Sequence, residues 1–142
     1  MIYNRIKKRV MAKKKKKIMR MRIIRDIEQL DPRFKQIVYD LVKDLEYHRI
    51  PIKPFETKRT LERQKKLYKD GASKTLKSKH LEGLACDFVV VDNKDKWSWD
   101  YKLYAHYYDM FGAIAVKKYG LVWGGNWENF RDYPHVHFIV EE

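Results

Sequence analysis

Two segments of the sequence, far apart along the chain, carry side chains that commonly bind metal ions. His80 and Asp87 lie close together, and a further histidine comes from the pair His135 and His137 near the C-terminus. Two imidazoles and one carboxylate suit zinc, and three protein ligands leave a fourth position open for water, as in catalytic zinc sites. On a strand His135 and His137 point to the same face, so spacing alone leaves open which of them binds the metal.

A carboxylate that could move protons lies next to these histidines. Asp132 precedes His135 by three residues, and in a straight strand the two side chains would face opposite ways. Tyr133 and Pro134 predict a bend, which lets Asp132 take a proton from the water on the metal. A turn residue without a catalytic role is the alternative reading of Asp132, and Glu82 is a rival candidate for the base.

Four sequence blocks resemble one known family. Residues 78–87 read S-x-H-x-x-G-x-A-x-D, similar to the signature of the zinc D-Ala-D-Ala carboxypeptidase and L-alanyl-D-glutamate endopeptidase family. Residues 59–71 are similar to its R-[ST]-x-x-x-Q-x-x-L-Y-x-x-G block, and W-G-G-N-W at 123–127 and D-Y-P-H at 132–135 follow in family order. Aspartate rather than glutamate in D-x-x-H is typical of the short phage and bacterial endopeptidases that cut between L-Ala and D-Glu.

The resemblance implies a role for individual residues. It makes His80, Asp87 and His135 the zinc ligands. Asp132 becomes the catalytic carboxylate, and Arg59 steadies the scissile carbonyl or a nearby substrate carboxylate. The residues expected to bind substrate are Ser78, His137, Trp127 and Gln64.

Two positions depart from the family pattern. Asn126 stands where the family's W-G-G-D-W block has aspartate, and His137 stands where many relatives have an acidic or amide side chain. If the family aspartate orients a ligand histidine, the amide of Asn126 does so only in part, and activity is reduced. His137 is expected either to touch substrate or to hydrogen-bond the ligand shell.

The elements expected to position these residues form an α+β fold, with a small antiparallel sheet and about three helices around a zinc-binding cleft. Asp31 and Pro32 predict a helix start, with an apolar stripe running to about residue 48. Thr60 can cap a second helix, and a third is expected over about 100–118. The continuous apolar run in residues 84–91 predicts a central strand. Residues 72–82 are expected to form a loop, and 121–123 and 135–140 to form strands.

The positive charge of the chain is concentrated at its N-terminus. The formal net charge is +13, yet residues 1–22 hold eleven Lys or Arg and no acid, leaving 21 basic and 19 acidic residues in 23–142. We therefore expect residues 1–22 to form a basic, disordered or extended tail, and 23–142 a single metallopeptidase domain. The tail could bind an anionic wall polymer or a membrane.

The remaining features narrow the function. Cys86 is the only cysteine, so an internal disulfide is excluded, and no apolar run is long enough to span a membrane. The N-terminus lacks the apolar stretch of a secretory signal. We expect a monomer made in the cytoplasm that acts on peptidoglycan stem peptides after release, as an endolysin does. The alternatives are a D,D-carboxypeptidase, a catalytically inactive wall-binding relative, and a nucleic-acid-binding protein or nuclease, which the nearly neutral body disfavours.

Overall fold

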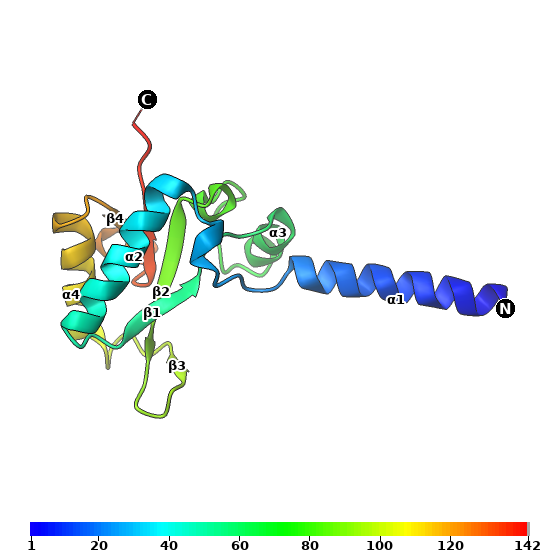
Figure 1. The fold of residues 1–142 in the computed structure, drawn as a ribbon, viewed down its shortest axis with the longest axis horizontal. Helices are drawn as coiled ribbons and strands as arrows, with labels where there is room; N and C mark the ends of the chain where they lie inside the picture. The colour runs from blue at the N-terminus through cyan, green and yellow to red at the C-terminus, as the bar shows by residue number, and fades with distance from the viewer. Residues whose placement is uncertain (142) are drawn as a thin grey trace.

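The computed structural model describes residues 1–141, in which one antiparallel sheet carries helices α2 and α4 on one face (Figure 1). Helix α2 (Pro32–Tyr47) begins where the sequence predicts, because the carboxylate of Asp31 accepts a hydrogen bond from the Arg33 backbone N–H at 2.9 Å. Its apolar stripe faces the sheet, and the buried residues of that stripe are Phe34, Val38, Leu41 and Leu45.

The sheet is built around β2, as predicted. The strands lie in the order β1-β2-β5-β4, and β3 pairs with the same edge of β2 as β5, further along the strand. Every pairing is antiparallel. The strands are β1 (Ile52–Glu56), β2 (Ala85–Val91), β3 (Trp97–Ser98), β4 (Val122–Trp123) and β5 (His135–His137).

Strand β2 divides the domain into two sides. Cys86, Phe88 and Val90 alternate along it and are fully buried in the core beneath α2 and α4 (Ala105–Lys117). The ring of Phe88 lies 5.1 Å from that of Phe111 in α4. Successive side chains of a strand point to opposite faces, so Asp87 and its neighbours on the second face point away from this core.

The remaining elements are short. Helix α3 (Leu61–Lys69) is capped by Thr60, as predicted, and the 3₁₀ turns η1 (Ile27–Gln29), η2 (Lys79–Glu82) and η3 (Gly124–Asn126) connect the larger elements. Helix α4 begins at Ala105 rather than near residue 100, because the Asp100 carboxylate accepts from the Leu103 N–H at 3.0 Å and holds a turn there. The α+β prediction is confirmed.

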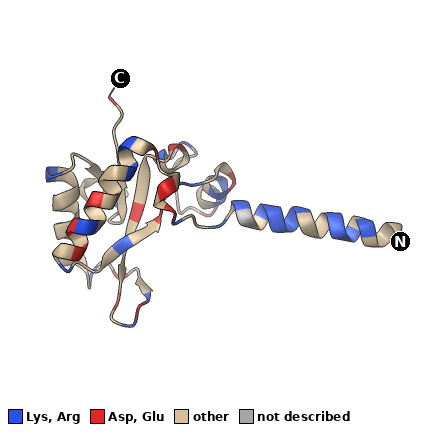
Figure 2. Ribbon diagram, in the orientation of Figure 1, with Lys and Arg blue, Asp and Glu red and all other residues tan. Residues whose placement is uncertain are grey.

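The N-terminal segment differs from the prediction of a disordered or extended tail. It forms helix α1 (Ile2–Arg20), which projects from the body (Figure 1) with Lys and Arg along its length (Figure 2). Its residues include no Gly or Pro, and most of them are good helix formers, whose intrinsic preference outweighs the repulsion of like charges here. Among the described residues, no helix is long and apolar enough to cross a membrane.

Candidate active site

A tight turn brings His80 to the second face of β2. The Ser78 hydroxyl caps η2 by accepting from the His80 backbone N–H at 3.2 Å. Gly83 ends the turn at a φ of +70°, where a Cβ would lie 3.0 Å from the backbone nitrogen of Asp31. Only glycine meets both demands without strain, and this turn brings His80 back over Asp87.

The imidazole of His80 is held in one orientation. Its Nδ1 lies 2.7 Å from the carbonyl oxygen of Thr57, and its Nε2 lies 3.2 Å from Asp87 Oδ1. The carbonyl can only accept, so Nδ1–H donates to it and Nε2 is the nitrogen that faces Asp87. With 2% of its surface exposed, the His80 imidazole is buried against Asp87.

The two C-terminal histidines occupy different layers of the site. His135 stands directly opposite Asp87 in the β2–β5 pairing, with its Nδ1 3.6 Å from Asp87 Oδ1. Its Nε2 lies 2.8 Å from Nδ1 of His137. Burial, and then the charge of His135, lower the pKa of His137 to about 4. His137 is therefore neutral at pH 7, and its Nδ1 can accept a hydrogen bond from His135. The structure therefore places His135 next to Asp87 and His137 behind it.

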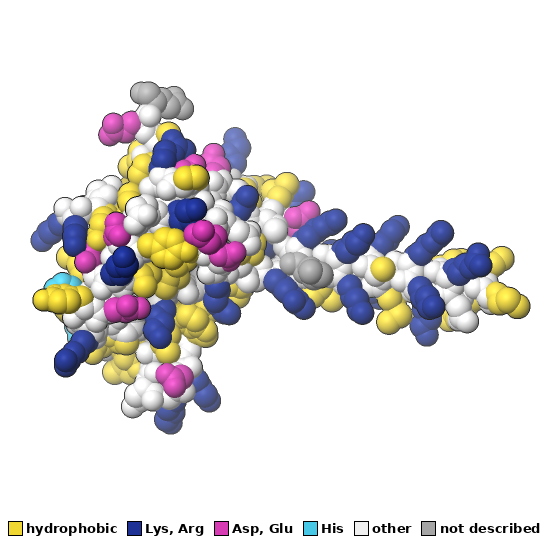
Figure 3. Space-filling model, in the orientation of Figure 1, with side chains coloured by type: hydrophobic (Ala, Val, Ile, Leu, Met, Phe, Trp, Pro, Cys, Tyr) yellow, Lys and Arg dark blue, Asp and Glu magenta, His cyan; other side chains and the backbone are white. Residues whose placement is uncertain are grey.

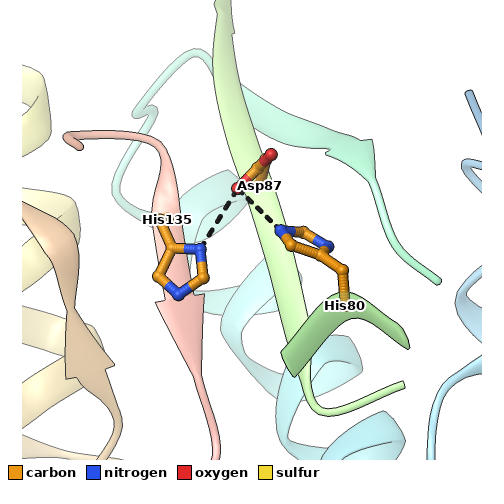
Figure 4. A group of neighbouring side chains, drawn as sticks. All are labelled: His80, Asp87 and His135. Carbon is orange, nitrogen blue, oxygen red and sulfur yellow. Dashed lines mark hydrogen bonds and ion pairs between the residues drawn. The ribbon is translucent and has the colours of Figure 1, made fainter. Parts of the chain in front are cut away.

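The three side chains predicted as metal ligands converge (Figure 4). One donor atom from each of His80, Asp87 and His135 lies within 4.8 Å of the other two. Burial alone would raise the pKa of Asp87, but the charges and hydrogen bonds of His80 and His135 lower it well below its usual range. Two imidazole nitrogens and one ionised carboxylate are a donor set that fits a divalent transition metal such as zinc.

Arg59 fixes the other oxygen of this carboxylate. Its guanidinium lies 3.5 Å from Asp87 Oδ2, 2.6 Å from the carboxylate of Glu56 and 2.8 Å from the amide oxygen of Gln64. Glu56 also accepts from the guanidinium of Arg63, and it is almost fully buried. Glu56 was not among the residues predicted for the site, although its position three residues before Arg59 was an available signal.

Gln64 differs from its prediction as a substrate-binding residue. Its side chain is fully buried and does not line the cleft. Its amide nitrogen donates to the Ser73 hydroxyl at 2.9 Å and to the Thr75 carbonyl at 2.6 Å, while its oxygen accepts from Arg59. Gln64 therefore fixes the loop after α3 to Arg59, and both its amide nitrogen and its oxygen are engaged inside the protein.

The predicted bend before β5 is present. The His135 N–H donates to the Asp132 carbonyl at 3.2 Å, and the Asp132 N–H donates to the Gly124 carbonyl at 3.1 Å. A Cβ on Gly124 would come within 2.3 Å of that Asp132 oxygen, so the close approach requires glycine. Burial, then the charge of Asp87, raises the pKa of the Asp132 carboxyl to about 6. Asp132 is thus a carboxylate that can exchange a proton near neutral pH.

One cleft of about 430 Å³ is lined by the three converging side chains together with Arg59, Glu56 and Asp132. Ser78 and Trp127, the positions expected to bind substrate, are among the residues that line it, with the Trp127 ring 5.1 Å from that of His135. Glu82 lies outside the lining, exposed and 3.8 Å from Lys79. Asn126 is exposed and makes no side-chain bond to either C-terminal histidine among the described residues. The aromatic residues of the lining are Phe55, Trp99, Tyr101, Trp127 and Phe130.

The chain is similar to known cell-wall peptidases. A family described as D-alanyl-D-alanine carboxypeptidase matches residues 71–138. An L-alanyl-D-glutamate peptidase of Listeria phage A118 is 32% identical over 117 residues, covering 82% of this chain and 41% of that protein. The peptidoglycan L-alanyl-D-glutamate endopeptidase CwlK of Bacillus subtilis (strain 168) is 31% identical over 94 residues, covering 57% of this chain and 56% of that protein.

A solved structure agrees with these matches. The L-Ala D-Glu endopeptidase ChiX of Serratia marcescens superposes with a TM-score of 0.62 at 28% identity, covering 80% of this chain and 83% of that one. The chain spans about two fifths of the phage peptidase and just over half of the Bacillus enzyme. In sequence and in fold, the chain is thus similar to D-alanyl-D-alanine carboxypeptidases and L-alanyl-D-glutamate endopeptidases.

Proposed function

We propose that this chain is a zinc-dependent peptidoglycan hydrolase that cuts the stem peptide between L-Ala and D-Glu. The observation that carries the proposal is the convergence of His80, Asp87 and His135 in a cleft that also contains Asp132. The names of the phage, Bacillus and Serratia relatives support the choice of bond. The place of action that this substrate implies is the cell wall.

The zinc ion would be held by Nε2 of His80, a carboxylate oxygen of Asp87 and Nδ1 of His135. When bound, it supplies Lewis-acid activation of water and of the scissile carbonyl. The other nitrogen of each histidine is already engaged, on the Thr57 carbonyl for His80 and on His137 for His135. Such outer contacts fix the tautomer and the direction of the ligands, and we assign His137 to this positioning role.

Asp132 is proposed to act as the general base and then as the general acid. Its carboxylate removes a proton from the attacking water, holds it on a carboxyl oxygen, and transfers it to the departing amine of D-Glu. A pKa of about 6 suits both proton transfers. At neutral pH the carboxyl is mostly ionised and free to accept a proton, and it is a stronger base than an ordinary aspartate. The bend at Pro134 puts this carboxylate on the same side as His135.

Arg59 is proposed to orient Asp87 rather than to meet the substrate. Its two terminal nitrogens are occupied by Glu56, Gln64 and Asp87, and its Nε is buried without a partner among the described residues, so the guanidinium is held against the carboxylate of Asp87. Lys74 is an exposed cation that lines the cleft and could meet the substrate. A positive charge there suits the free carboxylate of D-Glu and favours an acidic residue at the scissile bond.

Digestion of purified peptidoglycan tests this proposal. We expect new free amino groups on D-Glu, identified by mass spectrometry, with the release abolished by a chelator and restored by zinc. Release of D-Ala instead would identify a D,D-carboxypeptidase. No cleavage with zinc bound would identify a wall-binding relative without activity.

A matched pair of carboxylate variants makes the assay specific. Asp132→Asn is expected to lower kcat by about 100-fold or more, the usual contribution of a general base. Glu82→Gln removes a neighbouring carboxylate that is exposed and outside the cleft, so it is expected to leave kcat within about twofold. Equal losses in both variants would contradict the role of Asp132.

We also propose that α1 attaches the enzyme to an anionic surface of the cell envelope. Basic side chains project from it along its length (Figure 3), and it exposes apolar ones, among them Ile2, Ile6 and Val10 at four-residue spacing. Deleting residues 1–20 is expected to abolish binding to phosphatidylglycerol vesicles and to isolated walls at low salt, with kcat on a soluble peptide unchanged. Undiminished binding to both surfaces after the deletion would contradict this attachment.

A further inference from the structure

Three aromatic rings lie together beside the metal-ligand cluster. Phe55 packs edge-on against Trp97, with centroids 5.1 Å apart, and against Trp99, with centroids 4.9 Å apart. The guanidinium of Arg25 lies 4.6 Å from the centroid of Phe55 and 5.2 Å from that of Trp97. These contacts hold the rings in fixed relative orientations. We call Phe55, Trp97 and Trp99 the aromatic platform.

The register of the sheet locates the platform relative to the site. Strands β1 and β3 flank opposite edges of β2. Phe55 lies at the register shift opposite Asp87 and Phe88, and Trp97 pairs with Val91, which puts Trp99 level with Val89. Phe55 comes from one edge of β2 and the two tryptophans from the other, so their rings can meet only over a face of β2. That face bears Val89 and also Asp87, because alternate residues of a strand share a face. Val89 is fully buried beneath them. Val89 lies two residues along β2 from Asp87, so the platform is about 7 Å along the strand from the Asp87 carboxylate.

The platform is not needed for the core. The core beneath α2 and α4 lies on the other face of β2 and includes none of the three rings. Arg25 shields Phe55, but half of the Trp99 side chain is exposed, and both Trp99 and Phe55 line the cleft. The exposed indole keeps apolar surface in contact with water, which is unfavourable, and a ligand with an apolar face would cover that surface.

We infer that the platform binds the sugar from which the stem peptide is suspended; this inference rests on the proposed function. In peptidoglycan, L-Ala is amide-linked to the lactyl group of N-acetylmuramic acid. A single residue spans at most about 3.6 Å, so an enzyme that cuts after L-Ala has that sugar within about two residue lengths of its reacting atoms. The separation of the platform from Asp87 matches this reach.

The chemistry of the substrate also selects the sugar. The residues that flank the scissile bond are alanine, with one methyl group, and glutamate, with an acid, and neither offers a broad apolar surface. A pyranose ring does, through the C–H bonds of one face, and it can lie flat on an indole as an extended ligand lies on aromatic groove walls. Trp99 is the ring free to stack, and Phe55 and Trp97 support it.

Paired substrates test the inference. We compare kcat/KM for a muramoyl stem peptide and for the same peptide with an acetyl group in place of the sugar. The wild type is expected to prefer the muramoyl form by about tenfold, the size of one good aromatic contact. Trp99→Ala is expected to bring this ratio close to one, and Trp99→Phe to keep part of it. Tyr47→Ala, an exposed aromatic outside the cleft, is the matched control and is expected to keep the full ratio.

A binding measurement separates this inference from the proposed function. N-acetylmuramoyl-L-alanine has no scissile bond, and we titrate it into the protein held metal-free by chelator. The indole N–H signals of Trp97 and Trp99 are expected to shift and saturate, and that of the buried Trp123 to stay in place. Saturable shifts without cleavage of any peptide would refute the proposed function and leave the platform standing. An unshifted Trp99, or an unchanged substrate ratio in Trp99→Ala, would overturn the platform.

Discussion

The two faces of β2 use the same strand for different purposes. On the helix side, Cys86, Phe88 and Val90 are apolar, fully buried and packed against α2 and α4. On the cleft side, Asp87 is a charged group surrounded by partners that neutralise it. Because successive side chains of a strand alternate between its two faces, one seven-residue segment can both anchor the core and present the Asp87 carboxylate to the cleft. Alternate residues of β2 therefore serve stability on one face and the chemistry of the cleft on the other.

The two faces also differ in what they require of their neighbours. Packing on the helix side needs volume and shape, and many apolar side chains supply these. The carboxylate of Asp87 needs specific partners, because a buried charge without them costs several kcal/mol. His80, His135 and Arg59 supply those partners from three different elements. Substitutions on the two faces should therefore fail in different ways.

The largest expected effect is on the cleft face. Asp87→Asn keeps the size of the side chain but removes the charge that a divalent metal requires. We expect kcat/KM to fall by on the order of a thousandfold or more, equivalent to several kcal/mol of lost metal-assisted stabilisation. Steady-state kinetics on a soluble stem peptide measures the loss, and circular dichroism checks that the fold persists. Retained activity would break the proposed division between the faces.

The neighbouring position on the helix face should affect stability instead. Phe88→Ala removes a fully buried ring from the core and is expected to lower the free energy of unfolding by about 3–5 kcal/mol. Urea unfolding measures this change. The fraction that remains folded should still bind zinc with wild-type affinity, and a selective loss of affinity there would show that the two faces are coupled.

The proton-transfer role of Asp132 predicts a pH dependence. Burial and the charge of Asp87 raise its pKa to about 6, and only the ionised form can accept a proton. Activity should therefore fall as the pH drops through this pKa, and a bound dication would move the acid limb to or below pH 6 because it favours the ionised form. The pH profile of kcat/KM measures this limb, which should vanish from the residual activity of Asp132→Asn.

The smallest expected effect lies at the start of α2. Asp31→Ala removes the cap on the Arg33 N–H and should lower the free energy of unfolding by about 1 kcal/mol, with kcat unchanged. The hydrogen bond with the Arg33 side chain lowers the pKa of Asp31 from 3.8 to about 2. The carboxylate therefore stabilises the fold above pH 3.8, and this contribution is lost as the pH falls through 2. The free energies of unfolding of the wild type and the variant should therefore become equal as the pH falls below about 2.

Much of the architecture could be predicted from the sequence where local signals agreed with burial. The cap and apolar stripe of α2, the cap of α3 and the apolar run of β2 gave the correct elements. Strand β3 was missed, because a two-residue strand has no periodicity. Helix α1 was missed, because the charge of its lysine run was weighed above its helix propensity.

The side chains that converge in the site were predictable, and the contacts that support them were less so. The motifs brought out His80, Asp87, Asp132 and, through D-x-x-H, His135. The spacing of a strand alone could not rank His135 against His137, since both point to one face of β5. Their order depends on the pairing of His135 with Asp87, a contact between distant segments. The Thr57 carbonyl that fixes His80 is a backbone group and has no signature in a sequence.

Metal content is the most direct test of the central claim, that His80, Asp87 and His135 hold one catalytic zinc ion. We predict one zinc per chain by elemental analysis of the wild type, and its loss in His80→Ala, Asp87→Asn and His135→Ala. His137→Ala should retain zinc with an affinity lowered by about 10- to 100-fold, because it removes only an outer support. A wild-type protein that binds no zinc, or zinc that survives in His135→Ala and is lost in His137→Ala, would contradict the account.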